Sequence, residues 1–196
     1  MRTSIIERNT NETKIKLILN LDGTGKYDID TGCGFLNHML ELFTAHGKFD
    51  LTLFCDGDTD VDYHHTAEDI AIVLGKAFSE ALEDRKGIKR YGSMLLPMDE
   101  ALILTAIDIS GRDCLVYTLD IPSQKIGDFD TELVKEFLLG FTRSLACSLH
   151  AKQLAGENSH HIVEGLFKSL GRSLKEAVSI DEKFANEIPS TKGTII

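Results

Sequence analysis

Residues His64-His65-Thr66-Ala67-Glu68-Asp69 have a second copy, His160-His161-Ile162-Val163-Glu164-Gly165, located 96 positions further along the chain. Each copy places its first histidine and its glutamate four residues apart, a spacing that puts both side chains on one face of an α-helix. The pattern therefore predicts two helices, each offering an imidazole and a carboxylate to one metal ion. The second histidine of each copy points about a quarter-turn away and can bind a different ion. Together the two copies predict ligands for two metal positions.

Further matches between the two halves indicate an internal duplication. Leu74-Gly75-Lys76 corresponds to Leu170-Gly171-Arg172 at the same spacing of 96, and residues 19–23 correspond to residues 107–111 at a spacing of 88. Matches in the same order along both halves are typical of a duplicated unit. We therefore expect one globular unit over 1–196, made of a first half at about 1–86, a second half at about 87–186 and a tail at 187–196.

Apolar periodicity predicts the same order of elements, strand, strand, helix, strand and helix, in each half. The expected elements are strands at 14–21, 26–30 and 49–54 with helices at 35–46 and 64–81, then strands at 101–109, 114–119 and 147–154 with helices at 131–145 and about 160–178. We expect 26–30 to form a hairpin with 14–21 and 114–119 to pair with 101–109, whereas 1–11 is predicted to be a polar arm and 87–92 a basic connector. The predicted fold class is α+β, a duplicated pair of ββαβα-type units whose antiparallel sheets are each covered by two helices.

Composition narrows the classes of function. A net charge of −10 argues against a general role in binding nucleic acid, so an anionic substrate would need a local cluster of Arg and Lys. No apolar run approaches the roughly 18 residues of a membrane span, and no signal peptide is evident. The four cysteines form no CxxC pair, which is typical of a reducing compartment. We expect a cytoplasmic protein.

The ligand types restrict the metal without selecting it. Imidazole and carboxylate donors without thiolate suit Mn(II), Fe(II), Zn(II) or Ni(II), and the two glutamates favour the harder ions. His38, which opens the helix before the first pair, is a further candidate ligand. Its counterpart by duplication is Glu136, with which His150 on a predicted strand competes for the same role. The acidic run from Asp56 to Asp62 lacks the glutamate of a calcium loop and is expected to be a solvated loop.

Several segments together identify a family. They are residues 34–40, the two His-His segments, 97–101, 156–161 and 189–193. In combination they resemble the imidazoleglycerol-phosphate dehydratase family of histidine biosynthesis, and the match covers nearly the whole chain. Two departures are Asn37, where the family usually has Asp, and Glu136, where many members have His.

The resemblance implies the Mn(II)-dependent loss of water from imidazoleglycerol phosphate, giving imidazoleacetol phosphate. Two metal ions per active site would hold the substrate's imidazole as imidazolate, whose electron density expels the neighbouring hydroxyl through a diazafulvene-like intermediate. The implied proton carriers are Glu12, Glu68 and Glu164. The implied metal ligands are His38, His64, His65, Glu68, Glu136 or His150, His160, His161 and Glu164.

Substrate binding and assembly follow from the same resemblance. The implied substrate-binding residues are Glu12, His46, Arg90, Arg112, Lys168, Ser190 and Lys192, the last two in the tail. Arg suits bidentate contact with a phosphate and Lys a point contact. Family members form shells of 24 identical subunits with active sites between chains, so we expect a homo-oligomer. Two other readings stay open, a di-metal hydrolase with a bridging water and a non-catalytic metal-binding protein, but both leave the Ser190-Thr191-Lys192 tail without a role.

Overall fold

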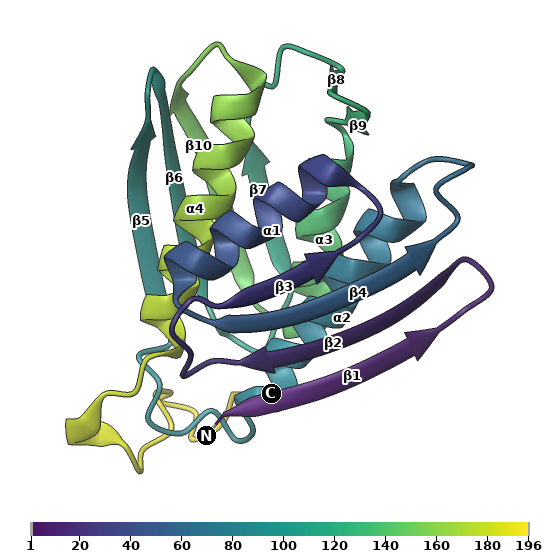
Figure 1. Ribbon diagram of the computed structural model, residues 1–196. Coiled ribbons are helices and arrows are strands. Elements are labelled where there is room, and N and C mark those ends of the chain that lie inside the picture. Colours follow the sequence, from purple (N-terminus) through teal and green to yellow (C-terminus); the bar gives the residue numbers. More distant parts are fainter. Residues whose placement is uncertain (1, 196) are drawn as a thin grey trace.

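The structure is a computed structural model that describes residues 2–195 (Figure 1), so Met1 and Ile196, at the ends of the predicted unit, lie outside it. The strands are β1 Thr3–Asn9, β2 Thr13–Asn20, β3 Tyr27–Asp30, β4 Asp50–Gly57, β5 Tyr91–Met98, β6 Ala101–Asp108, β7 Cys114–Thr118, β8 Lys125–Ile126, β9 Phe129–Asp130 and β10 Ser148–Ala155. The helices are α1 Gly34–Gly47, α2 His64–Ala81, α3 Leu133–Leu145 and α4 Ser159–Val178, followed by a 3-10 turn at Glu182–Phe184.

The predicted duplication and the α+β class are confirmed. Each half contains three strands, a helix, a strand and a helix, and only the second half has the small β8–β9 hairpin before α3. In β2 the side chains alternate between buried and mostly exposed, and in β6 they alternate between buried and partly buried. Apolar residues on one face of each strand therefore build the two halves in the same way.

The order of the strands corrects two predicted pairings. The first sheet has the order β1-β2-β4-β3 and the second β5-β6-β10-β7. β3 is not the hairpin partner of β2, because β4 lies between them and pairs with β3 in parallel. Likewise β7 pairs in parallel with β10 and not with β6. The long alternating strands β4 and β10 bury more apolar side chains than β3 and β7, and therefore take the inner positions.

Four further strands were not predicted. Two of them, β8 and β9, form the short hairpin before α3. Residues 1–11, expected to be an arm, contain β1, and β5 begins at Tyr91, inside the predicted connector 87–92. β1 and β5 are edge strands that bury few residues: β1 buries only Ser4 and Ile6, and β5 only Gly92 and Leu96. Their apolar signal is weak for that reason. Pro97 is tolerated in β5 because an edge strand can lack one donor.

The four helices form the interior between the two sheets (Figure 1). α1 packs on α4 and α2 packs on α3, so each helix contacts a helix of the other half as well as its own sheet. The core is one continuous cluster of apolar side chains from both halves, including Phe43, Phe78, Phe141 and Phe167. This arrangement brings the start of α1 against the start of α4. No helix within residues 2–195 has the length and apolar character needed to cross a membrane.

Candidate active site

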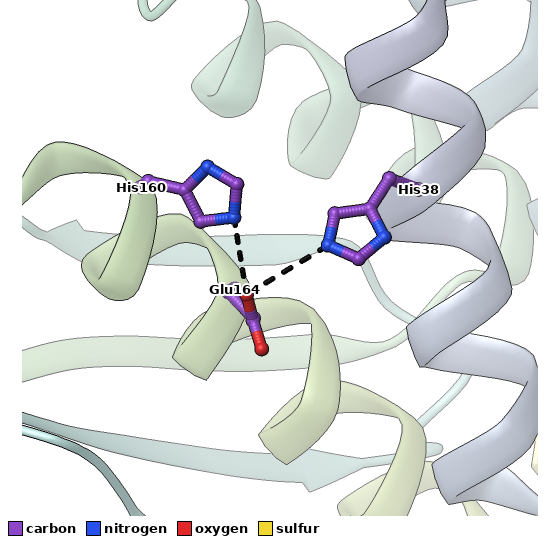
Figure 2. A group of neighbouring side chains, drawn as sticks. All are labelled: His38, His160 and Glu164. Atoms are coloured by element: carbon purple, nitrogen blue, oxygen red, sulfur yellow. Dashed lines mark hydrogen bonds and ion pairs between the residues drawn. The ribbon is translucent and has the colours of Figure 1, made fainter.

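Three predicted ligands from opposite halves of the chain converge at the contact of α1 with α4 (Figure 2). His160 Nε2 lies 3.1 Å from Glu164 Oε2, and His38 Nε2 lies 3.8 Å from the same oxygen. One donor atom from each residue falls within 4.8 Å of the others. This spacing allows a single cation to contact all three, so imidazole and carboxylate donors meet as the His-His pattern predicts.

Local structure holds the two histidines in place. Asn158 caps α4, and its side chain accepts hydrogen bonds from the backbone N–H groups of His160 and His161. Phe35 packs edge-on against the His160 ring, with ring centroids 5.4 Å apart. Asn37, the departure from the family pattern, accepts hydrogen bonds from Thr31 and so fixes the loop that leads into α1.

Glu164 is buried and charged. Burial alone raises its pKa, but the ion pair with Lys168 and the contact with His160 outweigh this effect, so the pKa of Glu164 lies below its ordinary value. Lys168 Nζ donates to Glu164 Oε1 at 2.5 Å. The predicted phosphate-binding lysine and the predicted proton carrier therefore lie next to each other on one face of α4.

The second histidine of each pair is oriented by a carboxylate. His65 Nδ1 lies 2.8 Å from Asp58, and His161 Nδ1 lies 2.7 Å from Glu100. These hydrogen bonds raise the pKa of both histidines, and the bond from His161 lowers the pKa of Glu100 to about 2. A proton held on Nδ1 leaves the lone pair of Nε2 free for a metal, as is usual in carboxylate–histidine–metal arrangements.

Asp58 corrects the prediction that the acidic run is only a solvated loop. One oxygen of Asp58 orients His65, and the other is buried without a hydrogen-bond partner among the described residues. Glu100 was likewise not predicted as a site residue. Its position opposite Glu12 in the duplicated halves is a signal that could have identified it.

The remaining predicted ligands lie apart from this cluster. His64 Nε2 and Glu68 Oε2 are 3.9 Å apart on α2, which confirms their shared helix face. Glu136 lies on α3 one turn before Gly140, whose backbone packs against the carbonyl of Glu68. His150 is exposed on β10, away from these contacts. The metal-binding roles of all four stay predictions.

A cavity of about 430 Å³ opens beside the cluster. Its walls include Phe35, His38 and His160 from the helices together with Tyr63, the residue before the first His-His pair. Phe129 of the β8–β9 hairpin also lines the cavity. An aromatic wall next to candidate imidazole ligands is suited to holding a small planar ring.

A second cavity, of about 570 Å³, collects positive charge. It is lined by His46 and by four cations that sequence analysis did not select, Lys48, Lys89, Arg172 and Lys175. The one carboxylate in its wall, Glu176, is engaged by the backbone N–H of Ser93 at 3.0 Å. Burial, followed by the charges of Lys168, Arg172 and Lys48, lowers the pKa of His46. Helical spacing along α4 could have identified Arg172 and Lys175, which continue the line of Glu164 and Lys168.

The other predicted phosphate-binding residues are placed differently. Arg90 pairs with Asp108 at 2.7 Å and donates to the carbonyl of Pro189 at 2.9 Å, so it ties the tail to the sheet. Ser190 and Lys192 follow in that tail and are at least partly exposed. Arg112 lies exposed in the turn after β6. Within residues 2–195 these groups do not line the cavity at His46.

Comparison with known proteins decides the family. The family model described as imidazoleglycerol-phosphate dehydratase matches residues 31–174, which contain both His-His segments. The chain belongs to the imidazoleglycerol-phosphate dehydratase family. It is 57% identical over 188 residues to the imidazoleglycerol-phosphate dehydratase of Clostridium novyi, covering 96% of this chain and 95% of that protein. It is 52% identical to that of Caldicellulosiruptor bescii, covering 99% of this chain and 98% of that protein.

Solved structures of the family have the same fold. The imidazoleglycerol-phosphate dehydratase of Staphylococcus aureus superposes with a TM-score of 0.83 at 37% identity, covering 91% of this chain and 99% of that one. The enzyme from Pyrococcus furiosus, solved in complex with (S)-C348, superposes with a TM-score of 0.84 at 36% identity, covering 96% and 99%. The chain is thus a dehydratase of histidine biosynthesis, and dehydratases are lyases.

Proposed function

We propose that this chain removes water from imidazoleglycerol phosphate at a site with two Mn(II) ions, one of which binds between the two halves of the chain. The convergence of His38, His160 and Glu164 carries the proposal. Neutral imidazoles and a carboxylate suit a divalent first-row ion. The unpartnered buried oxygen of Asp58 and the oriented Nε2 atoms of His65 and His161 support further metal binding.

The ligand groups would be completed by other chains. His64, Glu68, His65 and His161 lie partly exposed, away from the three-residue cluster, where ligands of a neighbouring subunit could reach them. Exposed apolar side chains on the sheets, among them Ile5, Phe54, Leu95 and Leu154, offer surface for such contacts. We extend the proposal to a homo-oligomer of 24 subunits joined in part by metal, with Glu136 or His150 as an additional ligand.

The protein residues have distinct parts in the reaction. Bound metal ions supply positive charge that stabilises negative charge developing on the substrate. Glu164, which the ion pair with Lys168 holds ionised, is proposed as a proton carrier as well as a metal ligand. Glu12 lies on the exposed side of His65, with its Oε1 3.7 Å from Nε2, and is suited to exchange a proton with a substrate bound there. Glu68 is the third proposed proton carrier.

The phosphate would bind at the cation-rich end of α4. From Glu164 the helix continues through Lys168 to Arg172 and Lys175, which line the cavity at His46. The substrate has an imidazole at one end and a phosphate at the other, so it needs metal ligands and cations along one line. The order of residues along α4 therefore supports a phosphate site in the cavity at His46. Arg90, Arg112, Ser190 and Lys192 are proposed to reach the phosphate from neighbouring subunits.

The location of the protein is proposed to be the cytoplasm. All four cysteines are free, as a reducing compartment would keep them. Burial raises the pKa of Cys147 to about 12, and burial with nearby carboxylates does the same for Cys55. Both thiols are therefore protonated at neutral pH and poorly reactive.

Turnover of metal-free protein with and without Mn(II) tests the reaction. We expect imidazoleacetol phosphate to form only with Mn(II). Cleavage of phosphate esters in place of water loss would favour a di-metal hydrolase, and stoichiometric metal binding without turnover would favour a binding protein. Sedimentation of the same samples tests the assembly, because thorough chelation should convert large particles into smaller ones, and an unchanged size would contradict metal-joined subunits.

A further inference from the structure

A buried polar network lies beneath the turn that carries Glu12. Asp69, on α2 directly after Glu68, is only 5% exposed, although it is a carboxylate. Its two oxygens are both engaged: Thr13 Oγ1 donates to Oδ2 at 2.5 Å, and Arg8 Nη2 donates to Oδ1 at 2.7 Å. A buried charge satisfied in this way is costly to remove or to leave half-paired.

The network fixes both sides of the Glu12 turn. Thr10 Oγ1 accepts from the backbone N–H groups of Glu12 at 3.2 Å and Thr13 at 2.9 Å, and Thr10 N–H donates to the carbonyl of Thr13 at 2.8 Å. The carbonyl of Glu12 in turn accepts from the backbone N–H of Asp58 at 3.0 Å. All the backbone anchors of Glu12 are therefore independent of its own carboxylate, which remains 54% exposed beside His65.

The second half of the chain, as far as the structure describes it, has no equivalent of this network. The position equivalent to Asp69 is Gly165, which has no carboxylate, and an added Cβ there would lie 3.0 Å from Ile103 Cγ1. The carboxylate of Glu100, the counterpart of Glu12, is instead held by hydrogen bonds. It accepts from the backbone N–H of Asn158 at 2.8 Å and contacts His161 Nδ1 at 2.7 Å. The duplicated glutamates thus differ in their contacts: the carboxylate of Glu12 is exposed, whereas that of Glu100 is held by hydrogen bonds.

We propose that Asp69 is a positioning residue that, through Thr13, holds Glu12 beside His65 with its carboxylate available for the reaction. In the first half the network leaves the carboxylate of Glu12 available as a proton carrier, whereas in the second half the carboxylate of Glu100 has a structural role. This inference rests on the proposed role of Glu12. A displaced Glu12 would still sit near the metal ligands but would transfer its proton poorly, so kcat should fall more than KM changes.

The experiment is a double-mutant cycle between Thr13 and Glu12, with steady-state kinetics in Mn(II) and metal content measured for each variant. We expect Thr13→Val to lower kcat by roughly tenfold to 100-fold with KM and metal content nearly unchanged. Thr13→Ser, which keeps the hydroxyl, should restore most of kcat. In a Glu12→Gln background Thr13→Val should lower kcat little further, because Thr13 affects kcat by positioning Glu12.

Two further variants keep the test decisive. Thr105→Val removes a buried hydroxyl, bonded to Ser173 at 3.0 Å, from the equivalent sheet of the second half, and should leave kcat nearly unchanged. Arg8→Gln, a less buried member of the network, should reproduce the fall in kcat in milder form and serves if Thr13→Val does not fold.

The outcomes distinguish a wrong role for Glu12 from a wrong role for Asp69. If Glu12→Gln is fully active, the role of Glu12 is wrong and this inference falls with it. If Glu12→Gln is impaired but Thr13→Val costs the same factor in both backgrounds, only the positioning role of Asp69 is overturned. An equal loss of kcat in Thr105→Val would also overturn it, because any buried hydroxyl would then have the same effect.

Discussion

Gly171 of α4 packs against the backbone carbonyl of Phe43 in α1, too closely for any side chain to fit between them. Gly75 of α2 meets the carbonyl of Phe141 in α3 in the same way. The duplication has thus preserved a glycine at both helix crossings, and the first of these crossings joins the two helices that carry His38 and Glu164. The spacing of the proposed metal ligands therefore depends on a glycine about two helical turns from Glu164.

Gly171→Ala should therefore separate α1 from α4. We expect a loss of about 1–3 kcal/mol in the free energy of unfolding, because the backbone must move to admit the methyl group. Mn(II) affinity should fall as well. Urea unfolding and metal titration measure the two effects. Gly34→Ala is the control, since an added Cβ at Gly34 meets no atom within 4 Å. Equal effects of both substitutions would contradict this account.

The cavity at His46 predicts a selective defect in substrate binding. Arg172→Gln combined with Lys175→Gln removes two cations that line it, and should raise KM for the phosphate substrate by roughly tenfold or more while kcat changes less. The matched control is Lys135→Gln, an exposed lysine on α3 outside this cavity. An unchanged KM would place the phosphate elsewhere.

The pair of His161 and Glu100 predicts a pH dependence in the metal-free protein. The pKa of His161 is raised above 6.5, so its stabilising contribution is present below pH 6.5 and is lost as the pH rises through that raised pKa. The pKa of Glu100 is lowered from 4.5 to about 2, so its contribution is present above pH 4.5 and is lost as the pH falls toward 2. The pair should therefore stabilise the protein most between pH 4.5 and pH 6.5.

NMR titration of the histidine rings measures this effect. Glu100→Gln should move the pKa of His161 down toward its ordinary value, because its charged hydrogen-bond partner is gone. The pKa of His65, which is raised chiefly by Asp58, should not change and is the internal control. An unmoved His161 would show that Glu100 does not orient it.

A loop contact should govern stability in acid. Asp50 Oδ1 accepts from the backbone N–H groups of Thr24, Gly25 and Lys26 at 2.8, 3.1 and 2.9 Å. Burial raises the pKa of Asp50, but these hydrogen bonds outweigh it, so the pKa lies below 3.8. Stabilisation by the carboxylate is therefore present above pH 3.8 and is lost as the pH falls below it. Asp50→Asn should cost about 1 kcal/mol at neutral pH, and the difference should vanish in acid unfolding experiments.

The sequence predicted the repeated elements because each half has strong apolar periods at the inner strands and the long helices. It did not predict the order of the strands, because β3 and β7 are short and carry no mark of which neighbour they join. Edge strands β1 and β5 were missed for a related reason, since each buries only two residues. Pairing in these sheets is decided by how much apolar surface each position buries, and this quantity depends on the whole fold.

The candidate site was predictable where ligands share a helix and less so where they do not. The spacing of His160 and Glu164 fixed their common face, whereas the approach of His38 depends on how the two halves pack. Asp58 contacts a histidine seven residues further along the chain, across a loop, and Glu100 contacts a histidine 61 residues away. Neither apolar period nor charge pattern distinguished these two residues from surface carboxylates. The buried role of Asp69 was hidden for the same reason.

Crystallographic anomalous scattering from protein loaded with Mn(II) locates the metal directly. We expect a manganese peak bounded by His38, His160 and Glu164, and in His38→Ala both this peak and turnover should disappear. A fully occupied manganese site elsewhere, with no metal between these three side chains in an active enzyme, would contradict the proposed metal site.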